Sequence, residues 1–152
     1  MTLRSRLEED LKAAMRAREA VRRDTIRYLR SEVQKAEKAE QRDFDDEDVL
    51  RVLGRQAAQR RESIEAFTKG GREDLVDKEK AELEIILEYM PEQMSEDQIT
   101  ELVRAAIEEV GASGPQDMGK LMGRLMPQTR GKADGRTVNE IVRRLLAGLS
   151  DS

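Results

Sequence analysis

The sequence of 152 residues contains neither cysteine nor histidine. The absence of cysteine excludes disulfides and thiolate nucleophiles, and the absence of histidine excludes imidazole-based acid–base catalysis. The usual zinc ligand sets are excluded with them. We therefore expect no catalytic residues, no metal site and no cofactor.

Aromatic residues are scarce, at 3% of the chain, and there are three prolines. A content of 39% charged residues is typical of a helical protein with a heavily solvated surface, because strands favour aromatic and β-branched residues. The 38% of hydrophobic residues can build a modest core, in one ordinary domain or two small ones. These values predict an all-α fold.

Long apolar runs are also missing. The first 18 residues, MTLRSRLEEDLKAAMRAR, are charged throughout and contain no hydrophobic segment of a signal peptide. No later segment approaches the roughly 20 apolar residues that a membrane span needs. We expect a soluble, cytoplasmic protein that does not associate with membranes.

Helical spacing of apolar residues predicts four helices in an N-terminal domain, residues 1–91. Thr2 is the predicted N-cap of the first helix, and Asp45 or Asp46 that of the third. The glycines of KGG, residues 69–71, end the third helix, and the fourth ends near Pro91. The four apolar stripes are Leu3, Leu7, Leu11 and Met15; Ile26, Leu29, Val33 and Ala36; Val49, Leu53, Ala57, Ile64 and Phe67; and Leu75, Leu83, Ile86 and Met90.

Three further helices are predicted in a small C-terminal domain, residues 92–152, which is not a repeat of the first. SEDQ, residues 95–98, is a capping box for the first of them, and Gly111 ends it. Pro115 suits the first turn of the next helix, and Pro127 is expected to force the chain out of it. The three buried stripes are Ile99, Leu102, Val103, Ala106, Ile107 and Val110; Met118, Leu121, Met122, Leu125 and Met126; and Val138, Ile141, Val142, Leu145 and Leu149.

Charge is distributed unevenly along this C-terminal domain. Residues 91–117 carry seven acidic residues and one basic residue, whereas residues 118–150 carry seven basic and two acidic residues. The overall net charge of −4 therefore hides a local basic segment.

Several of these basic residues fall on positions that face away from the apolar stripes, and two lie in a glycine-flanked loop. Such a loop allows close approach of a partner's backbone. We predict an RNA-binding surface formed by Lys120, Arg124, Arg130, Gly131, Lys132, Arg136 and Arg143. A secondary candidate on the second helix consists of Arg23, Arg27 and Arg30. The alternative is that both sets are ordinary solvated surface, which is the common role of charges opposite an apolar stripe.

The segment MGKLMGRLMPQTRGKADGRTVNEIV, residues 118–142, resembles the signature of the YqeY-like family and of the related GatB tail domain, which lies at the C-terminus of an amidotransferase chain. Residues 74–99, DLVDKEKAELEIILEYMPEQMSEDQI, resemble the central block of the same family. The resemblance implies an all-helical fold in two parts and a tail domain that helps to engage tRNA. Asp134 departs from the asparagine that amidotransferase tails often carry; it either weakens a phosphate contact or caps the last helix.

Three functions remain open at this stage. The first is a non-catalytic tRNA-binding helper that contacts backbone phosphates, with tRNA and a tRNA synthetase or amidotransferase complex as partners and no small-molecule substrate. The second is an accessory part of a glutamine-dependent carbon–nitrogen ligase complex; the chain itself lacks the activated nucleophile that releases ammonia from glutamine. The third is a helical protein-interaction module in which Met118, Met122 and Met126 form a docking groove, although at helical spacing these residues are more typical of a core.

One ion pair is also predicted, in the hairpin of the third and fourth helices. Arg60 and Glu79 interrupt apolar stripes at similar distances from the turn at Gly70 and Gly71, so antiparallel helices would bring them level. Glu82 is the alternative partner. We expect the pair to be buried or half-buried.

Overall fold

The computed structural model describes residues 1–150, in which the chain forms two compact units. The N-terminal unit is Met1–Met90, and the C-terminal unit begins at Pro91. The last two residues of the predicted C-terminal domain, 151 and 152, lie outside the described residues. All regular structure in the described part is helical, which confirms the predicted fold class. No helix in this part is both long enough and apolar enough to cross a bilayer.

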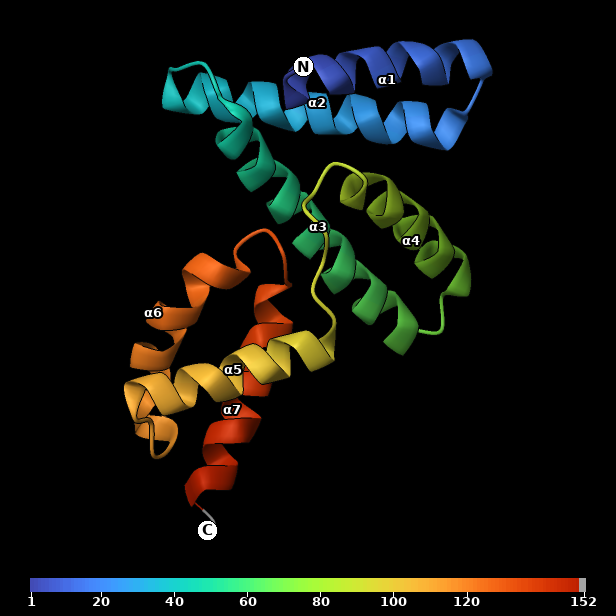
Figure 1. Cartoon of the computed structure of the whole chain (residues 1–152). Coiled ribbons are helices and arrows are strands. Elements are labelled where there is room, and N and C mark those ends of the chain that lie inside the picture. The colour runs from blue at the N-terminus through green and yellow to red at the C-terminus, as the bar shows by residue number, and fades with distance from the viewer. Residues whose placement is uncertain (151–152) are drawn as a thin grey trace. The chain divides into compact units, whose positions relative to one another are not determined.

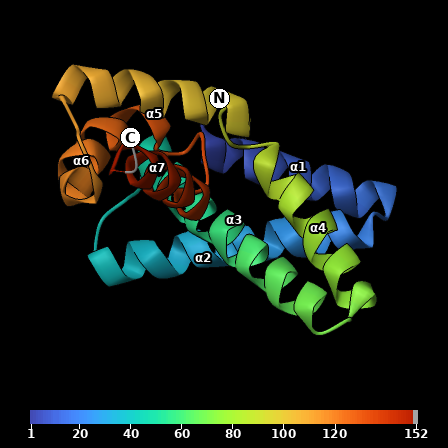
Figure 2. The same cartoon turned by 90° about the horizontal axis from the view of Figure 1, so that it is seen from below.

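The N-terminal unit contains four helices, as predicted (Figure 1). They are α1 (Leu3–Ala17), α2 (Ala20–Glu40), α3 (Asp46–Lys69) and α4 (Glu73–Leu87). Helices α1 and α2 lie side by side as one hairpin, and α3 and α4 form another, as the second view also shows (Figure 2). The turn of the second hairpin places Gly71 at φ +70°, the left-handed conformation for which glycine was predicted.

Both N-caps predicted for this unit are confirmed. The Thr2 hydroxyl accepts the backbone N–H of Ser5 at 3.1 Å, and the Ser5 hydroxyl accepts that of Thr2 in return. Of the two candidates at α3, Asp45 is the cap, accepting the N–H of Asp48 at 2.9 Å. The carboxylate of Asp46 instead accepts the N–H of Leu3 at 2.9 Å, so it joins the start of α1 to the start of α3.

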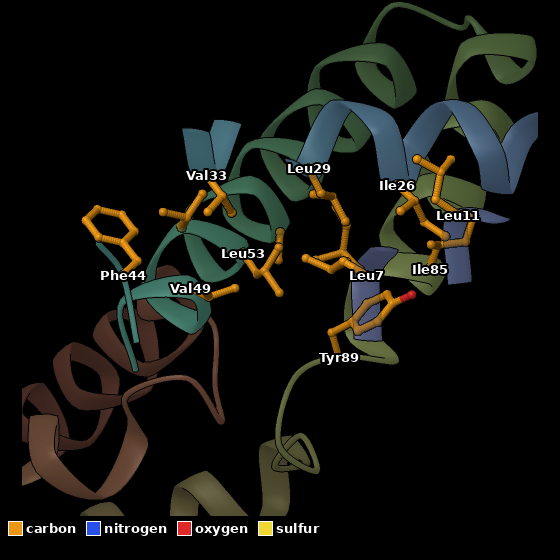
Figure 3. Close-up of a cluster of buried hydrophobic side chains, with 13 residues drawn as sticks. Leu7, Leu11, Ile26, Leu29, Val33, Phe44, Val49, Leu53, Ile85 and Tyr89 are labelled. Atoms are coloured by element: carbon orange, nitrogen blue, oxygen red, sulfur yellow. The ribbon is translucent and has the colours of Figure 1, made fainter. Parts of the chain in front are cut away.

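The core of the N-terminal unit lies where the two hairpins meet (Figure 3). Its fully buried side chains include Leu7 of α1, Ile26 and Leu29 of α2, Leu53 of α3 and Ile86 of α4. Burying such a side chain stabilises the fold by about 1.5–3 kcal/mol. The predicted stripes therefore supply the centre of this core.

Met15 was predicted to belong to the buried stripe of α1, and this prediction is wrong. Its side chain is 49% exposed, and Ala14 is buried in its place. A spacing of four residues drifts by about 40° per step around a helix of 3.6 residues per turn. After Leu3, Leu7 and Leu11, the stripe has turned away from the core by the time it reaches Met15.

The ion pair predicted in the α3–α4 hairpin is confirmed, with Glu82 as the nearer partner. The Arg60 Nε lies 2.9 Å from Glu82 Oε2 and 3.5 Å from Glu79 Oε2, and all three side chains are less than 20% exposed. The guanidinium also stacks over the Tyr28 ring, 5.2 Å from its centroid. Burial, and then repulsion from Glu82, raises the pKa of Glu79 above its usual value.

The C-terminal unit contains three α-helices among its described residues: α5 (Glu96–Val110), α6 (Met118–Thr129) and α7 (Gly135–Ser150). The predicted capping box is present, with Ser95 and Gln98 exchanging side-chain and backbone hydrogen bonds of 3.1 and 2.8 Å. Gly111 ends α5 at φ +67°. A 3-10 turn, Pro115–Asp117, leads into α6.

Pro127 does not force the chain out of α6, contrary to the prediction. The helix continues to Thr129, whose hydroxyl donates to the Leu125 carbonyl at 3.1 Å. Proline removes one backbone hydrogen bond, but its fixed φ is close to the helical value, and the chain stays helical for two more residues. The loop between α6 and α7 therefore begins at Arg130, three residues later than Pro127 suggests.

The core of the C-terminal unit is formed by all three helices. Because α7 packs against both α5 and α6, its buried face is wider than the predicted stripe and includes Leu146, while Leu145 and Leu149 are partly buried. Met118 and Met122 pack against this core, as their helical spacing indicated, but Met126 is 40% exposed. The fully buried core side chains include Ile99, Val103, Leu121, Leu125, Val138, Val142 and Leu146.

Candidate nucleic-acid interface

The loop between α6 and α7, residues 130–134, contains two of the predicted RNA-binding cations and is called the basic loop below. Its backbone folds back on the end of α6, because the Thr129 carbonyl accepts the N–H groups of Lys132 at 2.9 Å and Ala133 at 3.0 Å. Gly131 adopts φ +76°, which a residue with a side chain rarely reaches without strain. The glycine predicted in this loop is therefore needed by the turn itself.

Four of the predicted residues project cationic side chains into solvent in and after this loop. Arg130 and Lys132 come from the loop, and Arg136 and Arg143 come from α7; all four are exposed. Within residues 1–150, the side chains of Arg130 and Lys132 form no ion pair or hydrogen bond, so their charge is available to an anionic partner. An ordered backbone with available cations is the arrangement that phosphate contacts need.

Lys120 and Arg124 are also exposed, but the structure gives each of them a partner inside the unit. The Lys120 Nζ donates to the Val110 carbonyl at 3.0 Å, at the carboxyl end of α5. The Arg124 guanidinium donates from Nε and Nη2 to Glu109 Oε2, at 2.9 and 2.6 Å. These two residues connect α6 to α5, and they are less available to phosphate than the loop cations.

A carboxylate next to Lys120 lowers the positive potential there further. Asp117 accepts the backbone N–H of Ser113 at 2.8 Å, and this bond holds its pKa below the usual range, with a smaller effect from Lys120. Asp117 is therefore fully ionised at neutral pH. The start of α6 therefore offers less positive charge to an anionic partner than Lys120 alone would suggest.

Asp134, the departure from the family pattern, occupies the N-cap position of α7. Its backbone carbonyl accepts the N–H of Val138 at 3.1 Å, and its carboxylate accepts the Thr137 hydroxyl at 3.4 Å. Of the two roles considered for this residue, its position before Gly135 and its contact with Thr137 favour the cap. The carboxylate faces the helix terminus, where negative charge is favourable.

One contact of the candidate interface was not predicted from the sequence. The segment before α5, residues 91–94, lies against the basic loop and is called the strap below. Met94 N–H donates to the Lys132 carbonyl at 2.8 Å, and the Gln93 side-chain amide donates to the Gly131 carbonyl at 3.0 Å. The partners are 38 residues apart in sequence, and nothing in the residue pattern indicates that they meet.

The secondary candidates lie on α2, in the N-terminal unit. Arg23 pairs with Asp24 at 2.9 Å, and Arg27 lies exposed with its Nη2 3.9 Å from the Met15 sulfur. Arg30 is half-buried. The three therefore form one edge of α2 beside the exposed Met15, but Arg23 is already paired.

Among the described residues, the structure is that of a small all-helical protein in two compact units, one of which carries exposed cations in the loop between α6 and α7. The comparison with protein families is more specific. The family of Yqey-like proteins matches residues 4–146, and the chain belongs to this family.

Three similar proteins illustrate what the chain resembles. The chain is 35% identical over 130 residues to Altered inheritance of mitochondria protein 41, mitochondrial, of Pyrenophora tritici-repentis, covering 84% of this chain and 71% of the relative. The protein of that name from Lachancea thermotolerans is 37% identical over 112 residues, covering 72% of this chain and 60% of the relative. One component of the glutamyl-tRNA(Gln) amidotransferase of Thermococcus gammatolerans is 37% identical over 90 residues, which are 57% of this chain but 14% of that relative.

Proposed function

We propose that this protein is a non-catalytic tRNA-binding helper that contacts backbone phosphates through the basic loop. The observation that carries the proposal is the pair Arg130 and Lys132, exposed on an ordered backbone with no carboxylate partner within the described residues. The similarity to a component of an amidotransferase named for glutamyl-tRNA supports tRNA as the RNA and such a complex, or a tRNA synthetase, as the protein context.

Folded RNA suits this surface better than single-stranded RNA. The C-terminal unit has no aromatic residue from Pro91 onward, so it offers no ring on which an unpaired base could stack. In the N-terminal unit Phe44 and Tyr89 are buried, Phe67 is half-buried, and the more exposed Tyr28 is covered on one face by Arg60. Recognition would therefore depend on the shape and phosphates of a folded RNA.

The test has two parts. RNA that co-purifies with the protein is sequenced, and tRNA affinity is compared between the wild type and the Arg130→Ala, Lys132→Ala variant. The matched control is Lys80→Ala, Arg104→Ala, which removes the same charge from two other exposed positions. The proposal expects tRNA among the co-purified RNA and weaker binding in the loop variant alone. Equal affinity of the loop variant and the wild type would remove the basic loop from the interface.

A further variant tests the secondary candidate. Changing Arg23, Arg27 and Arg30 together to alanine should leave tRNA affinity near that of the wild type if the basic loop is the main contact. A loss as large as that of the loop variant would move the interface to α2.

We further propose that the isolated chain has no glutaminase or amidotransferase activity, because it lacks an activated nucleophile. Ammonia release from glutamine by the pure protein, abolished by a single substitution, would contradict this. For the location we propose the cytoplasm, with the mitochondrion as the alternative that the names of the relatives suggest.

A second candidate function is a protein-interaction module, in which the exposed Met126 of α6 would take part in docking. In this case a protein partner should co-purify whether or not nuclease is added, and no RNA should be recovered. The same result would fit a role as an accessory part of a carbon–nitrogen ligase complex.

A further inference from the structure

The strap holds two consecutive carbonyls of the basic loop. The Gln93 side-chain nitrogen donates to Gly131 O at 3.0 Å and to the strap's own Pro91 O at 2.7 Å. The next residue, Met94, donates its backbone N–H to Lys132 O at 2.8 Å, while its side chain packs against the core of the C-terminal unit. The strap is thus anchored in the core and bonded to the loop.

Without the strap bonds, the basic loop would still be held at the Thr129 carbonyl, but its backbone would have more freedom at Gly131. Gly131 lies between the two cationic residues, and glycine is the residue with the greatest backbone freedom. A shift in its φ and ψ would move Arg130 relative to Lys132. The strap bonds end on the carbonyls of Gly131 and Lys132. Holding these two carbonyls therefore fixes the position of Arg130 relative to Lys132.

Glutamine has the chemistry that this position needs. One amide nitrogen carries two hydrogens, and here they face two carbonyl oxygens, Pro91 O and Gly131 O. A glutamate of the same shape would place oxygen against oxygen. A methionine would have nearly the same length but no donor.

We propose that Gln93 is a positioning residue for the proposed RNA site, which holds Arg130 and Lys132 in the arrangement that binds phosphate. This inference rests on the proposed function. Gln93 carries no charge, and its side chain bonds to the backbone of the loop rather than to either cation. It can therefore affect RNA binding only through the positions of Arg130 and Lys132. Pre-ordering the loop raises affinity because less conformational freedom is lost on binding.

The test compares the full-length wild type with Gln93→Met in two measurements. The first is tRNA affinity across a range of salt concentrations. We expect roughly five-fold weaker binding, the equivalent of one lost hydrogen bond. The salt slope should stay unchanged, because the same cations still reach phosphate in the competent fraction of molecules. The second is hydrogen exchange of the amides of Lys132, Ala133 and Met94, which should become faster.

Gln98→Met is the matched control. It removes a glutamine side-chain hydrogen bond from the same unit, at the cap of α5, without touching the basic loop. Its tRNA affinity and its loop exchange should equal those of the wild type. A further control places Gln93→Met in the Arg130→Ala, Lys132→Ala background, where it should have no additional effect on affinity.

The outcomes separate this inference from the proposed function. Unchanged loop exchange and unchanged affinity in Gln93→Met would overturn the positioning role, as would an equal loss of affinity with and without the two loop cations. If the wild type binds no tRNA, the proposed function and Gln93's part in it both fail. If the loop amides of Gln93→Met still exchange faster in that case, Gln93 orders the loop but has only a structural role.

Discussion

The two units use their arginines differently. In the N-terminal unit, Arg22 makes a bidentate bond to Glu88 at 2.7 and 2.9 Å, and Arg60 bonds to Glu82, so these arginines join helices of that unit. In the C-terminal unit, Arg130 and Lys132 have no such partner within residues 1–150, although the backbone that carries them is held by hydrogen bonds. What sets the basic loop apart is that its two available cations flank one glycine on a hydrogen-bonded turn, which is why we propose it as the binding surface.

The largest expected effect is in the N-terminal unit. Arg60→Met leaves Glu79 and Glu82 half-buried without a cation, and we expect a loss of about 3 kcal/mol in the free energy of unfolding. The Arg60→Met, Glu82→Leu double variant should be more stable than the single variant, because it removes the nearer orphaned charge. Urea denaturation measures both. Identical midpoints for the single and double variants would mean that the pair makes no contribution.

A second effect in the N-terminal unit depends on pH. Asp48 accepts two hydrogen bonds from Arg42, and these bonds, followed by the N–H of Asp45, hold its pKa far below the usual range. A lowered folded-state pKa stabilises the protein above the unfolded-state value, near 3.9, and this contribution is lost as the pH falls below it. Asp48→Asn should therefore lose more stability at pH 7 than at pH 3. An equal loss at both values would show that the charge of Asp48 plays no part.

In the C-terminal unit, replacing two glycines of α6 should increase stability. Gly119 and Gly123 lie inside the helix with exposed backbones, and a Cβ at either position would meet nothing within 4 Å. Replacing each by alanine should stabilise the unit by about 0.5–1 kcal/mol, since glycine is the poorer helix former. Thermal unfolding of Gly119→Ala and Gly123→Ala tests this. A decrease in stability for either variant would show that the neighbouring structure needs the glycine.

The smallest effect is expected for the ion pair of the C-terminal unit. The side chains of Arg124 and Glu109 are both about half exposed, so solvent screens their attraction. Arg124→Ala should change the free energy of unfolding by less than about 0.5 kcal/mol. A loss as large as that of Arg60→Met would remove the contrast between the two units.

Local signals in the sequence predicted most of the fold. Thr2, Asp45 and Ser95 each stand three residues before a side chain that completes a capping box, and the structure shows all three boxes. The Arg60 pair was predictable because a hairpin with a glycine turn fixes which residues are level. Met15 and Pro127 were predicted wrongly, because a four-residue spacing drifts around the helix and because the fixed φ of proline is compatible with a helix.

The candidate site was only partly predictable. The cations and Gly131 could be identified from charge pattern and loop chemistry. Which of the cations is paired could not, because Glu109 meets Arg124 only through the packing of α5 on α6. The strap was missed because Gln93 and Gly131 are brought together by the tertiary fold alone.

The most direct test of the central claim is the dependence of tRNA affinity on salt concentration for the wild type and the Arg130→Ala, Lys132→Ala variant. If both cations contact phosphates, the slope of log affinity against log salt should flatten by about one unit for each lost contact. The stability of the variant should change by less than about 0.5 kcal/mol, because both side chains are exposed. An equal affinity and an equal salt slope for the two proteins would contradict the account.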